Sequence, residues 1–115
     1  MTEPFRLDVR AAGAGRAVIA IAGELDPATA PRLREQGLSL LTGGSPHLLL
    51  DMSGVDFCDS SGLSVVIGLW QQAHAGGGSL TLAAVPDRLT RLLRMTGTDS
   101  LIPVQHADSF SADQA

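Results

Sequence analysis

The 115-residue chain is 44% apolar and 17% charged, a balance that suits one compact domain with an apolar core. Its net charge of −4 and its aromatic content of 3% supply neither the basic stripe nor the stacking side chains of a nucleic-acid-binding protein. The N-terminus lacks the pattern of a signal peptide, and no apolar stretch approaches the roughly 20 residues that span a bilayer. One cysteine and three scattered histidines offer no metal-ligand spacing, so neither a metal nor a cofactor is expected. We therefore expect a single cytoplasmic domain over residues 1–115 that binds neither nucleic acid nor membrane.

The N-terminal part of the chain predicts a β-hairpin. Residues 5–10 alternate apolar and polar side chains, which is the pattern of a strand with one face in solvent. Gly13 and Gly15 turn the chain, and residues 16–22 (RAVIAIA) return as a β-branched strand. We expect these two strands to pair antiparallel at an edge of the sheet.

A helix is predicted to follow the hairpin. Asp26 can cap its N-terminus, and Pro27 suits its first turn, where a missing N–H does no harm. The apolar face of this helix is formed by residues at helical spacing: Ala30, Leu33, Leu38 and Leu41. A cluster of helix-breaking residues at 42–46 ends it.

The segment from residue 47 to residue 70 is the centre of the chain. It begins with the apolar run 48–50, which is too short for a helix and predicts a strand buried on both faces, as in parallel sheets. Residues 51–56 are expected to form a polar turn. A helix should then begin at Ser60, since the apolar residues that follow have helical spacing: Leu63, Val66, Ile67 and Trp70. The glycines at 76–78 end this helix.

The rest of the chain predicts two further short strands and one more helix. Leu80 and Leu82 mark a strand, residues 86–95 a helix, and residues 101–104 a last strand. The polar residues 106–115 are expected to fray or to form a weak terminal helix. The order β-β-α-β-α-β-α-β predicts an α/β fold: a mixed sheet of about five strands, antiparallel in its N-terminal edge hairpin and parallel thereafter, with helices mainly on one face.

The sequence DSSG at 59–62 places two hydroxyls at a helix N-terminus, beside the carboxyl end of a strand, where open α/β sheets bind their ligands. One interpretation is a hydrolase with Ser60 or Ser61 as the nucleophile. The motif is not G-x-S-x-G, however, and the three histidines follow no triad pattern: His47, His74 and His106. The hydrolase interpretation is therefore disfavoured.

A second interpretation is a receiver domain that is phosphorylated on Asp51, just after the predicted central strand. Such a domain uses an acidic pair after its first strand to hold magnesium and a late lysine to meet the acyl phosphate. This chain has no such pair and no lysine at all. Asp51 is better explained as a loop residue that accepts backbone N–H bonds at the strand end.

A third interpretation takes the serines as the regulated groups. Several motifs support it: GELD at 23–26, LLLDMS at 48–53, DSSGL at 59–63, and MTG at 95–97 ahead of LIPV at 101–104. With these motifs the chain resembles the STAS-domain anti-sigma factor antagonists, also called anti-anti-sigma factors. The resemblance covers nearly the whole chain, and the motifs are specific as a set.

This resemblance implies a phosphorylation switch. Ser60 is then the phosphoacceptor of a partner that is both an anti-sigma factor and an ATP-dependent serine kinase. Unmodified protein binds that partner and releases the sigma factor, phosphorylation ends the binding, and a metal-dependent serine phosphatase restores it. The chain itself has no catalysis. The residues expected at the partner surface are Glu24, Asp26, Asp59, Ser60, Ser61, Gly62, Leu63 and Ser64.

Elementary electrostatics agrees with such a switch. A phosphate on Ser60 would bring about two negative charges to a helix N-terminus, where the helix dipole favours an anion by about 0.3–1 kcal/mol. Phosphorylation should therefore leave the domain folded and act on the partner, at a surface that Asp26 and Asp59 already make acidic. Without the resemblance, DSSG would be equally well explained as an N-cap with no regulatory role.

A different class of function stays open within the same fold. STAS domains also serve as non-catalytic subunits of lipid transporters and as scaffolds of stress-sensing complexes, without kinase control. The intact DSSG at 59–62 favours the sigma pathway. Cys58, which precedes this motif, is interpreted as a small buried apolar side chain and not as a redox sensor.

Overall fold

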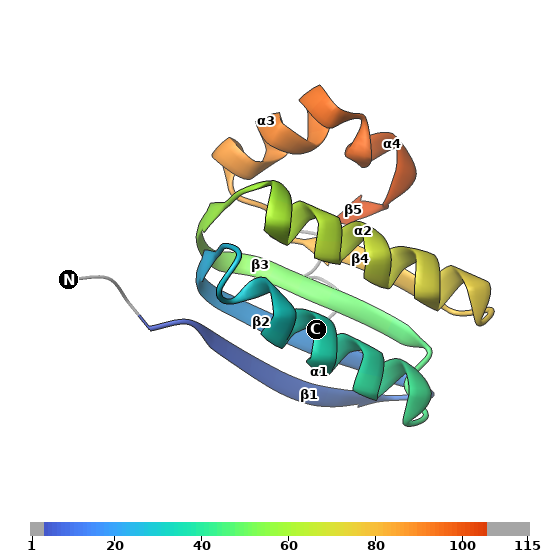
Figure 1. Ribbon diagram of the computed structural model, residues 1–115. Coiled ribbons are helices and arrows are strands. Elements are labelled where there is room, and N and C mark those ends of the chain that lie inside the picture. The colour runs from blue at the N-terminus through green and yellow to red at the C-terminus, as the bar shows by residue number, and fades with distance from the viewer. Residues whose placement is uncertain (1–3, 106–115) are drawn as a thin grey trace.

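The structure, a computed structural model, describes residues 4–105 as a five-stranded sheet with four helices (Figure 1). The strands are β1 (Arg6–Gly13), β2 (Arg16–Leu25), β3 (His47–Cys58), β4 (Ser79–Ala83) and β5 (Val104–Gln105). The helices are α1 (Ala30–Thr42), α2 (Ser60–Ala75), α3 (Asp87–Thr96) and α4 (Thr98–Leu101). The segment 106–115, for which the sequence predicts fraying or a weak helix, lies outside the described residues.

The strands lie in the sheet in the same order as in the chain. β1 pairs antiparallel with β2, and each later neighbouring pair is parallel. Gly13 and Gly15, which flank the hairpin turn, have φ angles of 78° and 74°, in the region that glycine adopts without strain. The predicted mixed sheet with an antiparallel edge hairpin is therefore confirmed.

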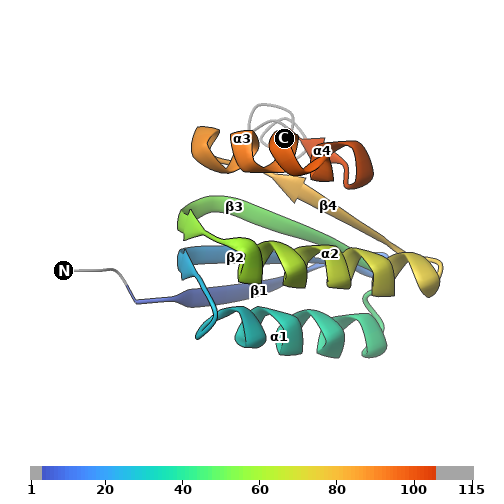
Figure 2. The same ribbon diagram turned by 45° about the horizontal axis from the view of Figure 1, so that its top comes forward.

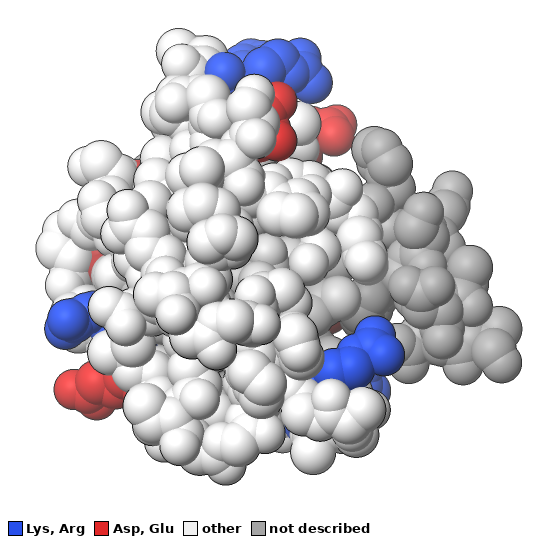
Figure 3. Space-filling view, turned by 90° about the vertical axis from the view of Figure 1, so that its right-hand side faces the viewer, with Lys and Arg blue, Asp and Glu red and all other residues white. Residues whose placement is uncertain are grey.

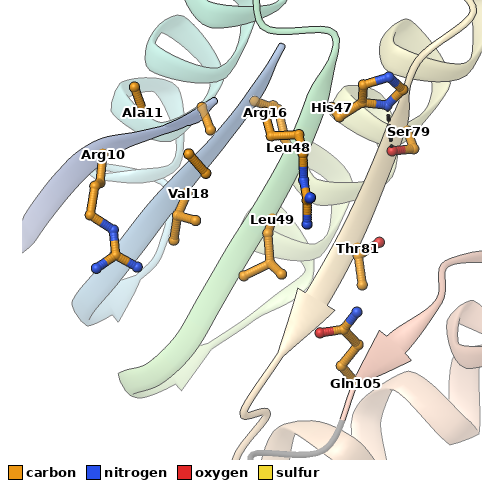
Figure 4. A pocket seen from close by; sticks show the side chains of 12 residues that line it. Arg10, Ala11, Arg16, Val18, His47, Leu48, Leu49, Ser79, Thr81 and Gln105 are labelled. Carbon is orange, nitrogen blue, oxygen red and sulfur yellow. Dashed lines mark hydrogen bonds between the residues drawn. The ribbon is translucent and has the colours of Figure 1, made fainter. Parts of the chain in front are cut away.

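The two longest helices cover one face of the sheet, also as predicted. α1 and α2 lie side by side against this face. α3 and α4 lie near the edge of the sheet that β4 and β5 form (Figures 1 and 2). The opposite face carries a groove of about 510 Å³, and Figure 4 shows some of the side chains along it, including Arg10, Leu49 and Thr81.

The apolar core lies between the sheet and the helices. Leu48 and Leu50 of β3 are buried, whereas Leu49 is half-buried and faces the groove on the opposite side. The central run is thus not buried on both faces. Other fully buried members of the core are Ile19, Ile21, Leu25, Leu33, Met52, Leu69, Leu80, Leu82, Leu93 and Ile102.

β3 is much longer than the sequence predicts, and the expected polar turn at 51–56 is wrong. The strand continues to Cys58 because β2 supplies a parallel partner along its whole length, while Met52 and Val55 are buried in the core. Gly54, a turn signal in the sequence, instead permits a close approach of two strands. A Cβ atom there would lie 2.9 Å from the carbonyl oxygen of Ile21.

The predicted last strand at 101–104 is also wrong in its position. Gly97 ends α3 with a φ angle of 77°, and the chain then makes one further helical turn, α4. The N–H of Ile102 donates to the carbonyl of Thr98 at 2.9 Å, and the Ile102 side chain is buried. Burial of Ile102 therefore favours the extra turn, and the strand follows as β5.

Truncation of the core should destabilise the protein far more than truncation on the opposite face. Leu50→Ala removes a fully buried side chain and should lower the free energy of unfolding by about 2–5 kcal/mol. Leu49→Ala, the matched control, removes the same atoms from a half-buried position and should lower it clearly less. Urea denaturation of both variants measures the difference. Equal losses would contradict the assignment of the two faces.

The start of α2 packs tightly against the end of β2. A Cβ atom on Gly62 would lie 2.6 Å from Cγ of Leu25 and 2.9 Å from Sγ of Cys58. Leu25 is fully buried, so a Cβ atom at position 62 would force the Leu25 side chain or the helix to shift. Glycine at position 62 therefore allows this close approach, which places the first turn of α2 against the ends of β2 and β3.

Two glycines of α2 should respond to alanine in opposite directions. Gly62→Ala forces overpacking against Leu25 and should lower the free energy of unfolding by about 1–3 kcal/mol. Gly68→Ala places its new methyl group in open space and should raise that energy by up to about 1 kcal/mol, because alanine favours the helix. Chemical denaturation of both variants provides the test, and a shift in the same direction for both would contradict the packing at Gly62.

Candidate functional site

The DSSG motif lies at the end of the sheet where β2 and β3 finish and α2 begins (Figure 1). Leu25 and Cys58, the last residues of these two strands, lie opposite each other in the sheet. The N–H of Asp59 donates to the carbonyl of Leu25 at 3.3 Å. The loop after β2 and the start of α2 therefore leave the sheet next to each other.

Asp59 is the N-cap of α2, so the DSSG segment does cap the helix, as one interpretation of the sequence holds. Its backbone is extended, and its Oδ1 atom accepts hydrogen bonds from the N–H groups of Ser61 at 2.9 Å and Gly62 at 3.3 Å. Two of the free N–H groups at the helix end are thus satisfied by one carboxylate oxygen. This cap makes Ser60 the first residue of the helix.

The two serines of the motif differ in exposure. Ser60 is exposed at the first position of α2, whereas Ser61 is half-buried. Gly62 and Leu63 are buried, and Ser64 is exposed again, one turn after Ser60. Ser60 and Ser64 are therefore the hydroxyls of this turn that an approaching protein meets first.

The loop after β2 is held by a side chain that sequence analysis missed, Thr29. Its hydroxyl donates to the carbonyl of Glu24 at 2.7 Å and accepts from the N–H of Asp26 at 2.9 Å. Oδ1 of Asp26 accepts from the N–H groups of Ala28 and Thr29. Asp26 thus closes the turn before the helix and is not its cap, because α1 begins only at Ala30. The spacing of Asp26 and Thr29, three residues apart, was the available signal.

All three predicted partner-binding carboxylates lie at this end of the sheet. Glu24 is exposed at the end of β2, Asp26 is half-buried in the loop that follows, and Asp59 is half-buried beside them. Figure 3 shows the opposite end of the molecule, where α1 and α2 finish, and most of the visible surface there carries no charged side chain.

Cys58 is half-buried and free. Burial, and then the negative charge of Asp59, raise the pKa of the Cys58 thiol to about 11. The thiol therefore stays protonated at neutral pH, and a protonated thiol is a poor nucleophile.

The geometry gives no support to the two rejected interpretations. His47 stands at the first position of β3, at the other end of the strand from Cys58 and roughly 30 Å from it, and His74 lies in the last turn of α2. Asp51 lies within β3, where its Oδ1 atom accepts from the N–H of Ser53 at 3.0 Å. Its predicted hydrogen bond is present, but its predicted place in a loop is wrong. Within residues 4–105, no three potential metal-binding side chains come together.

Known proteins resemble this chain in sequence and in fold. The family model described as "Mlab, STAS domain" matches residues 9–103. The anti-sigma-B factor antagonist of Bacillus subtilis (strain 168) is 38% identical over 84 residues, which cover 73% of this chain and 76% of that protein. An anti-sigma factor antagonist from Mycobacterium paratuberculosis has the same fold, with a TM-score of 0.78 and 25% identity over 89% of this chain and 86% of that one.

A further structural match is the Bacillus cell fate determinant SpoIIAA in its phosphorylated form, with a TM-score of 0.73 and 17% identity over 96% of this chain and 100% of that one. Among the helices that the structure describes, none has the length and apolar character needed to cross a bilayer. The family model covers most of the chain, and the similarity to the Bacillus subtilis protein extends over nearly three quarters of it. The chain belongs to the STAS-domain family of anti-sigma factor antagonists.

Proposed function

We propose that this protein is an anti-sigma factor antagonist controlled by phosphorylation of Ser60. In its unmodified form it binds an anti-sigma factor and thereby releases the sigma factor. The anti-sigma factor is also the serine kinase that phosphorylates Ser60, and a serine phosphatase removes the phosphate. The protein acts in the cytoplasm as one domain, as a switch and a substrate without catalysis of its own.

The exposed hydroxyl of Ser60 at the start of α2 is the observation that carries this proposal. A kinase needs a hydroxyl that it can reach, and Ser61 is less accessible because it is half-buried. A phosphate at Ser60 would lie near the helix N-terminus, where the dipole favours an anion. The switch therefore needs no unfolding of the antagonist.

The effect of the phosphate must then be felt by the partner. Glu24, Asp26 and Asp59 already make this end of the sheet acidic, and a phosphate adds about two further negative charges. A partner that covers this surface would have to bury those charges, which is unfavourable unless it supplies matching cations. The fold itself is compatible with phosphorylation, since SpoIIAA has been solved in a phosphorylated form.

Removal of the Ser60 hydroxyl should abolish phosphorylation. We expect the protein to be labelled at Ser60 when it is incubated with its anti-sigma factor kinase and ATP, and Ser60→Ala to remain unlabelled. Ser61→Ala and Ser64→Ala serve as controls and should still accept phosphate. Peptide mass spectrometry locates the modified residue. Full labelling of Ser60→Ala would falsify the assignment.

A negative charge at position 60 should weaken binding without unfolding the protein. Ser60→Asp should reduce affinity for the anti-sigma factor at least about tenfold, because the charge faces the partner. It should change the free energy of unfolding by less than about 1 kcal/mol, because an acidic side chain is tolerated at a helix start. Isothermal titration and urea denaturation measure the two effects.

Ser39→Asp provides the matched control for added charge, since Ser39 is exposed on α1 at a distance from the site. It should bind like the parent protein. A loss of several kcal/mol in Ser60→Asp would show that the switch acts by local unfolding. Aspartate carries less charge than phosphate, so enzymatically phosphorylated protein provides the decisive test. If the phosphorylated protein binds as tightly as the parent, the charge mechanism is wrong.

A further inference from the structure

A second groove opens beside the candidate site, between the end of β3 and α3. Its volume is about 420 Å³. The residues that line it are Val55, Asp56, Phe57, Cys58, Pro86, Arg88, Leu89, Arg91 and Leu92. We call it the β3–α3 groove. It adjoins the site, because Cys58, which lines it, directly precedes Asp59 and Ser60, and Phe57 lies opposite Glu24 in the sheet.

Phe57 gives this groove an exposed aromatic side chain. Half of its surface, 50%, remains accessible, although it lies only three residues before Ser60. The other aromatic side chains of the described residues, Phe5 and Trp70, are half-buried against the core. An exposed aromatic ring in a groove lined by leucines is the kind of anchor that protein interfaces bury.

Arg88 and Arg91 give the groove a positive rim. They lie three residues apart and therefore on one side of α3, and both are exposed. The groove also contains one carboxylate, Asp56, so that two positive charges stand against one negative charge. This sign is opposite to that of the surface around Asp59.

We propose that the β3–α3 groove is the second half of the docking surface for the anti-sigma factor. It takes an acidic segment of that partner, with an apolar side chain packed on Phe57 and carboxylates paired with Arg88 and Arg91. This inference rests on the proposed function and extends its partner surface. Phe57 lies opposite Glu24 in the sheet, so a partner that contacts the Glu24 end of the candidate site lies next to Phe57.

The two halves together would fix the orientation of the partner. An acidic segment is repelled by the carboxylates around Asp59 and attracted by the arginines of the groove. Rotation of the partner would bring like charges together on both sides. The surface therefore selects one arrangement, in which an added phosphate on Ser60 falls within the acidic half.

The test compares titrations of the parent protein and its variants with the anti-sigma factor that phosphorylates it. The double variant R88E/R91E should lose affinity by at least about tenfold, and its binding should depend less steeply on salt than that of the parent. Phe57→Ser should lose affinity by a similar factor. Arg94→Glu and Met95→Ser, exposed on the same helix but outside the groove, are the matched controls and should bind within about twofold of the parent.

The outcomes separate this inference from the proposed function. If the parent binds while R88E/R91E and Phe57→Ser bind as tightly as it does, the groove is not part of the interface and the inference is wrong, although the switch at Ser60 stands. If Arg94→Glu weakens binding as much as R88E/R91E, general charge and not the groove is responsible, and the inference is again wrong. If the parent binds no anti-sigma factor, the proposed function fails and this inference fails with it. Thermal melts of each variant ensure that the folded protein is compared.

Discussion

The contact between Gly62 and Leu25 is the constraint on which the candidate site depends. Leu25 is fully buried at the end of β2, and α2 can begin beside it only because position 62 has no Cβ atom. This packing fixes where the first turn of α2 lies. The carboxylate of Asp59 then accepts hydrogen bonds from two N–H groups of that turn, and the side chain of Ser60, the first residue of the helix, remains exposed. Apolar packing positions the helix, and a polar cap decides which hydroxyl faces the solvent.

The features that depend on local pattern could be predicted from the sequence. The hairpin follows from alternating side chains and two glycines, and the start of α2 at Ser60 follows from a capping aspartate ahead of helically spaced apolar residues. The mixed sheet follows in turn from the alternation of strands and helices. The phosphorylation switch is inferred from the resemblance to a known family, because DSSG alone is equally well explained as an ordinary helix cap.

The features that depend on distant partners could not be predicted. Gly54 signals a turn when only its neighbours are considered, but β2 lies alongside and turns the segment into a strand. The sequence predicts a strand that includes Ile102, whereas the structure has a further helical turn just before it and buries its side chain in the core. The β3–α3 groove joins Phe57 to Arg91, and these residues are separated by more than thirty positions in the chain. Only the folded chain brings them together.

The length of β3 has a consequence for how the proposed switch could diversify. Because β3 is paired with β2 as far as Cys58, Ser60 follows a hydrogen-bonded strand by two residues and does not lie in a long loop. Gly62 is required for packing against Leu25, Asp59 caps the helix, and Ser60 is the proposed phosphorylation site. These residues cannot vary freely, so the motif itself offers little to distinguish one partner from another. In the interface proposed above, partner identity would reside in exposed side chains around the motif, such as Phe57 and Arg91, which can change without disturbing the core. Duplicated copies of this fold can therefore share one chemical switch and still remain insulated from each other's signals in a single cell.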